Sequence, residues 1–116
     1  MQRDDKDMAR LWDMLDAARA ITSFIEGRSF AEFQMNRMLR NAVERNLEIL
    51  GEAARCISQH TRDRYPDIPW SSIIGLRNII AHEYGELRAE KIWGIGVNRL
   101  PELRARLEDM GLDEVP

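Results

Sequence analysis

The chain of 116 residues is long enough to bury one hydrophobic core but not two, so we expect a single domain over residues 1–116. Hydrophobic residues make up 44% and charged residues 32% of the chain, which excludes a disordered segment. The longest apolar runs are too short to cross a bilayer, so no membrane partner is expected. A net charge of −3 excludes a protein that coats nucleic acid indiscriminately, although 15 of the 17 basic residues are arginines, which bind phosphate well.

The N-terminus and the cysteine content indicate the compartment. No apolar segment typical of a secretory signal follows Met1. Cys56 is the only cysteine and has no partner for an intramolecular disulfide, so we expect it on a buried helix face. Both features favour a cytoplasmic protein.

The first half of the chain predicts two helices. From Met8 to Ile25 apolar residues recur every three or four positions, which indicates an amphipathic helix that ends near Gly27. Ser29 and Glu32 have the spacing of a capping box, and the apolar stripe that follows predicts one long helix to about His60.

The second half begins with a turn at Pro66 to Pro69, since proline is tolerated in the first turn of a helix but not inside one. A third helix is predicted from about Trp70 to Glu83. A last helical segment begins near Leu87 and is kinked or broken at Pro101. Sustained period-two alternation is absent from the sequence, so the predicted fold is an all-α antiparallel bundle of four to five helices.

The predicted helix over 70–83 has two different faces. At about 100° per residue, one side gathers the residues expected to face the core, Ile73, Leu76, Ile79 and Ile80. The opposite side carries Arg77, Asn78 and His82 around an apolar strip of Ile74 and Ala81. Asn78 and His82 are i,i+4 neighbours, whereas Arg77 lies about 140° from His82 on the helix. A face of this kind is typical of an interface, and we expect a second copy to pair here about a twofold axis.

The residue types on this face suit cleavage of an RNA phosphodiester bond. A histidine can take up or release a proton near neutral pH, and an arginine can stabilise the charge that develops on a phosphate. RNA supplies its own nucleophile, the 2′-hydroxyl, and the carboxylates show no metal-ligand spacing, so we expect no metal and no cofactor. Spacing alone does not decide for an enzyme, because such an arginine is more often ion-paired and such a histidine is more often a helix cap.

The segment Arg77-Asn78-Ile79-Ile80-Ala81-His82-Glu83-Tyr84 resembles the Arg-x4-His-x-Tyr motif of HepT-type toxins, which belong to the HEPN superfamily. The similarity spans nearly the whole chain. It includes a helix pattern that ends in Gly51-Glu52-Ala53, and it continues through Tyr65-Pro66, Ile68-Pro69-Trp70, Trp93 and Leu100-Pro101.

This resemblance implies a HEPN-like homodimer whose cleft holds a metal-independent endoribonuclease site for an RNA substrate. Arg77 and His82 would be catalytic, and Asn78 would support them. The resemblance also implies a partner, an MntA-like nucleotidyltransferase antitoxin of a type VII toxin–antitoxin system, which transfers AMP from ATP to Tyr84. An adenylyl group beside His82 would place bulk and negative charge where the substrate phosphate must lie.

Two alternatives stay open. One is a noncatalytic module that binds nucleotide or substrate and docks a nucleotidyltransferase, and the other is a degenerate homologue that keeps only its dimer. A titrating histidine beside an arginine favours cleavage, since docking needs neither. Outside the motif, we expect Gly51 to allow close helix packing and Trp70 and Trp93 to act as packing anchors. Glu52 is expected either to orient a motif residue or to be a surface charge.

Overall fold

In the computed structural model, which describes residues 3–112, the chain forms helices and no strand. The helices are α1 (Arg3–Ile25), α2 (Phe30–Met35), α3 (Arg37–Arg55), α4 (Gln59–Arg64), α5 (Trp70–Ile74), α6 (Leu76–His82), α7 (Gly85–Asn98) and α8 (Leu100–Glu108). The predicted all-α class is therefore confirmed.

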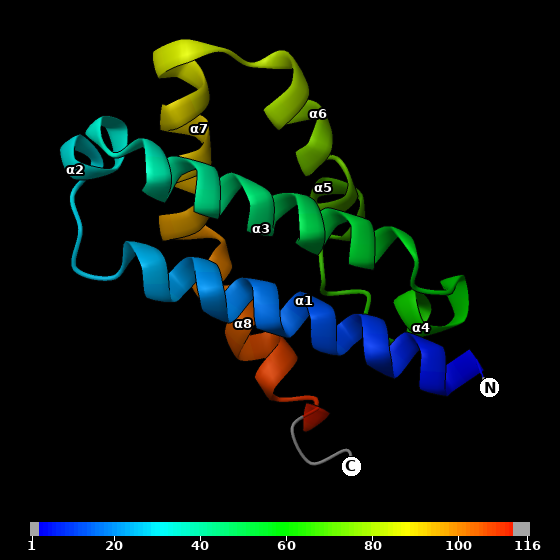
Figure 1. Ribbon diagram of the computed structural model, residues 1–116. Helices are drawn as coiled ribbons and strands as arrows, with labels where there is room; N and C mark the ends of the chain where they lie inside the picture. The colour runs from blue at the N-terminus through cyan, green and yellow to red at the C-terminus, as the bar shows by residue number, and fades with distance from the viewer. Residues whose placement is uncertain (1–2, 113–116) are drawn as a thin grey trace.

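The two longest helices, α1 and α3, lie side by side and antiparallel, with α2 at the corner where the chain turns between them (Figure 1). Helices α5 and α6 pack on α3, α8 packs on α1, and α7 contacts α2 and α8. The core is built mainly from α1 and α3, whose Met14, Leu15, Ile21, Leu47 and Leu50 are completely buried. Burial of these aliphatic side chains is the main force that holds the helices together.

The first turn of the bundle forms as the sequence predicts. Helix α1 ends at Ile25, and Gly27 follows with a φ of 74°, a left-handed conformation that glycine adopts without strain. Ser29 then begins α2 with the predicted capping box: its hydroxyl accepts a hydrogen bond from the Glu32 N–H, and the Glu32 carboxylate accepts one from the Ser29 N–H, both at 3.2 Å.

The prediction of one long second helix from Ser29 to His60 is wrong, because two polar side chains restart the helix. The Asn36 side chain accepts a hydrogen bond from the Leu39 N–H at 3.0 Å and so begins α3. Ser58 begins α4 in the same way through the Thr61 N–H. Cys56 is the C-terminal cap of α3 and is exposed, so the expected burial of Cys56 is also wrong.

The predicted third helix is divided at Gly75 into α5 and α6. The Gly75 N–H still bonds the Ser71 carbonyl at 3.0 Å, but the Asn78 N–H bonds the Gly75 carbonyl three residues back, also at 3.0 Å. This tighter turn interrupts the α-helical hydrogen-bond pattern and so separates α6 from α5. The expected break near Pro101 is confirmed: α7 ends at Asn98, and Pro101 lies in the first turn of α8.

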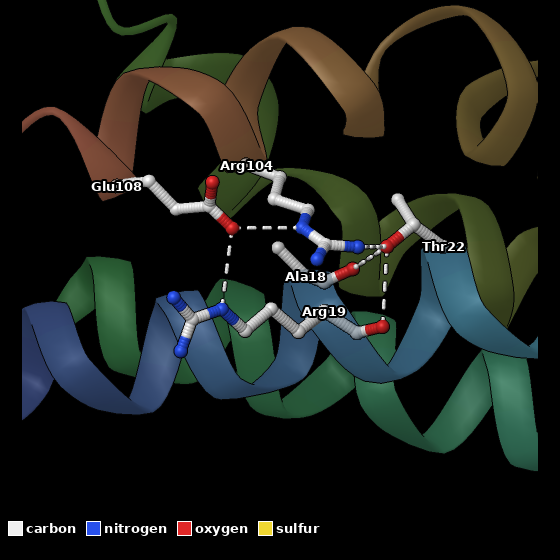
Figure 2. A network of polar contacts seen from close by, with 5 residues as sticks. All are labelled: Ala18, Arg19, Thr22, Arg104 and Glu108. Carbon is white, nitrogen blue, oxygen red and sulfur yellow. Dashed lines mark hydrogen bonds and ion pairs between the residues drawn. The ribbon is translucent and has the colours of Figure 1, made fainter. Parts of the chain in front are cut away.

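A polar cluster fastens α8 to α1, and we call it the α1–α8 clasp (Figure 2). Arg104 donates to the Glu108 carboxylate at 2.9 Å and to the Thr22 hydroxyl at 2.7 Å, while Arg19 donates to the same Glu108 oxygen at 3.2 Å. The Thr22 hydroxyl in turn lies within 3.1 Å of carbonyl oxygens in its own helix. The charged groups of the clasp are thus largely engaged with one another.

None of the helices described in residues 3–112 combines the length and the apolar character that a membrane span requires.

Candidate active site

Helix α6 turns the predicted motif residues toward solvent. Its Leu76 and Ile80 are buried in the core, as the helical wheel predicts, while Arg77, Asn78 and His82 are exposed. The amphipathic pattern therefore fixes the orientation of this short helix: burial of one side leaves the arginine, the amide and the imidazole on the other. Ala81 is exposed between them, whereas Ile74 precedes the Gly75 turn and is half-buried.

Within one copy of the chain, the motif side chains are exposed to solvent but do not contact one another through hydrogen bonds. No hydrogen bond among residues 3–112 joins Arg77 to His82 or Asn78 to His82. The side chain of Arg77 is 68% exposed, and its nearest ionic partner is Glu52 on α3, with 4.0 Å between Arg77 Nη1 and Glu52 Oε2. This separation is too long for a hydrogen bond, so the guanidinium keeps its donors available.

Gly51 explains how α3 and the α5–α6 segment come so close. A Cβ at this position would lie 3.0 Å from the carbonyl oxygen of Ile73 in α5, a tighter contact than nine in ten real Cβ atoms make. The prediction that Gly51 permits close helix packing is therefore confirmed. Because Glu52 follows Gly51 directly, the same close approach carries Glu52 to the base of α6.

Glu52 is shared between two arginines. Arg55, one turn further along α3, donates to both carboxylate oxygens, from Nε to Oε2 at 3.2 Å and from Nη2 to Oε1 at 2.5 Å. These bonds, followed by the weaker fields of Arg77 and Arg10 and opposed by partial desolvation, hold the pKa of the Glu52 carboxyl below its ordinary value of 4.5. Glu52 is thus a half-exposed charge that bonds Arg55 and lies beside Arg77 without a hydrogen bond to it.

The connection after α6 presents Tyr84. Glu83 ends α6 in an extended conformation and forms an ion pair with Lys91 of α7. Tyr84 follows as the N-cap residue of α7 and is 74% exposed, among the most exposed large side chains of the described chain. Gly85, with a φ of 60°, lets the chain turn directly into α7. The tyrosine hydroxyl is therefore accessible to another macromolecule, two residues from His82.

The remaining aromatic residues that the sequence singles out serve packing, as predicted. Trp70 is buried and donates from Nε1 to the Tyr65 carbonyl at 3.0 Å. The Trp93 ring lies 5.3 Å from the Phe33 ring and 6.2 Å from the Phe30 ring, centroid to centroid.

Two basic residues near the motif were missed by the sequence analysis. Arg55 could have been found, because it is three residues from Glu52 on one helix, the spacing at which side chains meet. Arg10 lies on α1 and enters the field of Glu52 only through the packing of α1 on α3, which no local pattern reveals. Among residues 3–112, no cluster of three or more His, Cys, Asp or Glu side chains has the arrangement of a metal site.

The chain matches a known protein family over most of its length. The family described as Ribonuclease HepT-like matches residues 14–110, a stretch that contains α3, α6, the whole motif and Tyr84. The chain belongs to the HepT-like ribonuclease family. This membership confirms the resemblance to HepT-type proteins of the HEPN superfamily, and with it the predicted enzyme class, a ribonuclease.

Individual HepT-like relatives align over most of their length. A protein of Methanocaldococcus jannaschii named "Putative RNase" is 37% identical over 107 residues, which cover 92% of this chain and 96% of that relative. A "Putative RNase" of Caldanaerobacter subterraneus subsp. tengcongensis is 31% identical over 86 residues, 74% of this chain and 77% of the relative. The "Probable ribonuclease HepT" of Thermococcus cleftensis is 29% identical over 110 residues, 95% and 98% of the two chains. No solved structure matches the chain.

Proposed function

We propose that this HepT-like protein is the toxin of a toxin–antitoxin pair, a metal-independent endoribonuclease that uses Arg77 and His82. One observation carries the proposal: in a chain of a ribonuclease family, the same exposed face of α6 carries Arg77, which has no close partner, and His82. Its competitor, a noncatalytic module that binds nucleotide or substrate, would use these residues to bind phosphate but does not need a titrating histidine beside the arginine.

The chemistry follows from these two groups. The 2′-hydroxyl oxygen of the RNA attacks the adjacent phosphorus, its proton passes to a base, and the bond from phosphorus to the 5′-oxygen breaks as that oxygen takes up a proton. An imidazole such as His82 can supply the base or the acid. Arg77 binds the non-bridging oxygens, on which charge grows in the transition state. The products are a 2′,3′-cyclic phosphate and a 5′-hydroxyl.

We further propose that the working site forms between two copies of the chain. One copy turns Arg77 and His82 outward without a bond between them, and the exposed Ala81 separates them on α6. Pairing about a twofold axis that runs past α6 brings Arg77 of each copy beside His82 of the other, so that the dimer holds two such sites. A monomeric solution mass with full activity contradicts this arrangement.

The test of cleavage uses a labelled single-stranded RNA in the presence of EDTA. His82→Ala is expected to lower the cleavage rate by about 10²- to 10⁴-fold, the usual contribution of a general acid or base. His60→Ala, which alters the second of the two histidines, on α4, is the matched control and keeps the parent rate. Cleavage by His82→Ala at the parent rate, or a parent that cuts only when a metal is added, contradicts the proposed mechanism. Growth arrest on expression should follow the same order.

Tyr84 is proposed as the control point of this site. A partner nucleotidyltransferase would form a bond from Tyr84 Oη to the α-phosphorus of ATP, with release of pyrophosphate and of the hydroxyl proton. The exposure of Tyr84 and its place two residues after His82 support this role, since an adenylyl group there blocks the approach of RNA.

Mass spectrometry after incubation with ATP and a nucleotidyltransferase encoded beside this protein tests the modification. AMP mass is expected on the parent and on Tyr65→Phe, which alters the other tyrosine, but not on Tyr84→Phe. Added AMP on Tyr84→Phe contradicts the assignment of Tyr84 as the sole acceptor.

A further inference from the structure

A compact charged cluster lies at the foot of α6, and we call it the Glu52 cluster: Glu52 and Arg55 of α3, Arg77 of α6 and, at its margin, Arg10 of α1. Both Arg55 and Arg77 approach the same atom, Glu52 Oε2, with Arg55 Nε at 3.2 Å and Arg77 Nη1 at 4.0 Å. Helices α3 and α6 therefore each direct an arginine toward a single carboxylate.

The donors around the Glu52 carboxylate are arranged as arginine donors are arranged around a bound phosphate. Arg55 holds the two carboxylate oxygens with two nearly parallel donors, the fork arrangement with which arginine also binds two phosphate oxygens. An anionic oxygen placed where Oε2 now lies would be within reach of Arg55 and Arg77 together. The cluster has more positive than negative groups, even after Arg10 is paired with Asp13 at 3.7 Å.

The carboxylate is also easy to displace. The side chains of Glu52 and Arg55 are 46% and 58% exposed, and ion pairs at such exposure contribute little to stability because water competes for both partners. A polyanionic strand that releases its counterions can therefore replace Glu52 at low energetic cost.

We propose that Arg55 is a second phosphate-binding residue of the ribonuclease site, and that Glu52 holds the phosphate position in the RNA-free protein. This inference rests on the proposed function and deepens it: Arg77 contacts the phosphate that reacts, Arg55 binds the same phosphate or the one next to it, and Glu52 swings away when RNA arrives. Glu52 and Arg55 take no part in proton transfer.

The test measures binding of a fluorescein-labelled single-stranded RNA to the full-length His82→Ala protein, which binds without cutting. In this background Arg55→Ala is expected to weaken binding about tenfold at low salt, as loss of one charge-assisted contact does. The slope of log Kd against log salt should fall by about 0.7. Glu52→Gln is expected to tighten binding about threefold, because the competing charge is gone.

The matched control is the pair Asp67 and Arg106, an exposed arginine–carboxylate fork with no motif residue beside it. Asp67→Asn and Arg106→Ala change the net charge by the same amounts and should leave RNA binding within twofold of the background protein. An effect on this pair equal to that on Glu52 and Arg55 would show that only net charge matters, and it would overturn the inference.

Three other outcomes contradict it. They are unchanged binding in Arg55→Ala, weaker binding in Glu52→Gln, and an absence of measurable binding at low salt by the background protein. The proposed function fails separately, when His82→Ala cuts RNA at the parent rate. Suppose that His82→Ala abolishes cleavage while Arg55→Ala leaves binding and KM unchanged. The proposed function then stands, and only the proposed role of Arg55 is refuted.

Discussion

The α1–α8 clasp and the Glu52 cluster contain the same kinds of residue but differ in how fully they are partnered. In the clasp, Arg104 bonds both Glu108 and Thr22, and Glu108 also accepts a bond from Arg19 (Figure 2). In the Glu52 cluster, one carboxylate faces Arg55 closely and Arg77 only at 4.0 Å.

On the proposed function, the difference separates charges that fasten helices from charges that bind RNA. Arg104 bonds Thr22 of another helix and so holds α8 on α1, whereas Arg77 is 68% exposed and lacks a short contact, so it still has most of its five donors. Of the arginines in these two clusters, the one with the longest contact to a partner is Arg77, which lies in the family motif.

The largest difference is expected between two alanine substitutions, one at an arginine of the Glu52 cluster and one at an arginine of the clasp. Arg77→Ala should lower the rate of RNA cleavage by about 10²- to 10³-fold, as loss of a group that stabilises transition-state charge does. Arg104→Ala, in the clasp, should leave the rate within about twofold, because its contacts are structural. Initial rates on one labelled RNA measure both, and equal losses would erase the distinction between the clasp and the Glu52 cluster.

The buried carboxylate of Asp7 is even more fully hydrogen-bonded than the charged groups of the clasp. Asp7 is 4% exposed and accepts hydrogen bonds from the Ser58 N–H at 3.0 Å, the Ser58 hydroxyl at 2.6 Å and the Thr61 hydroxyl. Asp7→Ala leaves these donors without their acceptor and should lower the free energy of unfolding by about 2–3 kcal/mol.

The control for Asp7 is Asp13→Ala on the same helix, where an exposed pair with Arg10 at 3.7 Å contributes less than about 0.5 kcal/mol. Urea denaturation measures both variants. RNA cleavage by folded Asp7→Ala should equal that of the parent, and a stability equal to that of Asp13→Ala would contradict the structural role.

The packing beneath the Glu52 cluster can be tested at Gly51. Gly51→Ala places a methyl group 3.0 Å from the Ile73 carbonyl and should cost about 1–2 kcal/mol as α5 moves away from α3. Gly94→Ala, in the middle of α7 with nothing within 4 Å of the added atom, should instead stabilise the fold by about 0.5–1 kcal/mol. Thermal unfolding that moves both variants in the same direction would contradict the close approach at Gly51.

The smallest effect concerns the pH dependence of the clasp. Hydrogen bonds from Arg104 and then Arg19 hold the pKa of the Glu108 carboxyl below its ordinary value of 4.5. A carboxyl with a lowered pKa stabilises the fold above pH 4.5, and that contribution is lost as the pH falls through its value in the folded protein. Glu108→Gln should therefore be slightly less stable than the parent at pH 7, and the difference in urea midpoint should shrink as the pH is lowered below 4.5.

Much of the fold follows from local patterns in the sequence. The apolar periodicity of α1, the capping box at Ser29 and the proline in the first turn of α8 each act within a few residues, so they can be recognised without knowledge of the packing. The breaks at Asn36, Ser58 and Gly75 were not predicted, because the apolar stripe continues across the first two and glycine inside a helix only lowers its stability. A single side-chain cap or a tight turn decides each of these positions.

The candidate site divides in the same way. The orientation of Arg77, Asn78 and His82 away from the core follows from the wheel of one helix, and it is confirmed. The proximity of Arg77 to Glu52, and the electrostatic effect of Arg10 on Glu52, depend on how α1, α3 and α6 pack, and the spacing within any one helix does not reveal that packing. The pairing of two copies is a further step beyond the single chain and stays a prediction.

That pairing, and the joint action of Arg77 and His82 within it, is tested most directly by mixing two inactive variants. Arg77→Ala and His82→Ala proteins are unfolded together, refolded and assayed for RNA cleavage, with heterodimers counted by differently sized tags. When the two residues of one site come from different subunits, each heterodimer regains one intact site, and the mixture should reach about a quarter of the parent activity. A mixture that contains heterodimers yet stays as inactive as either variant alone would contradict a site shared between two copies.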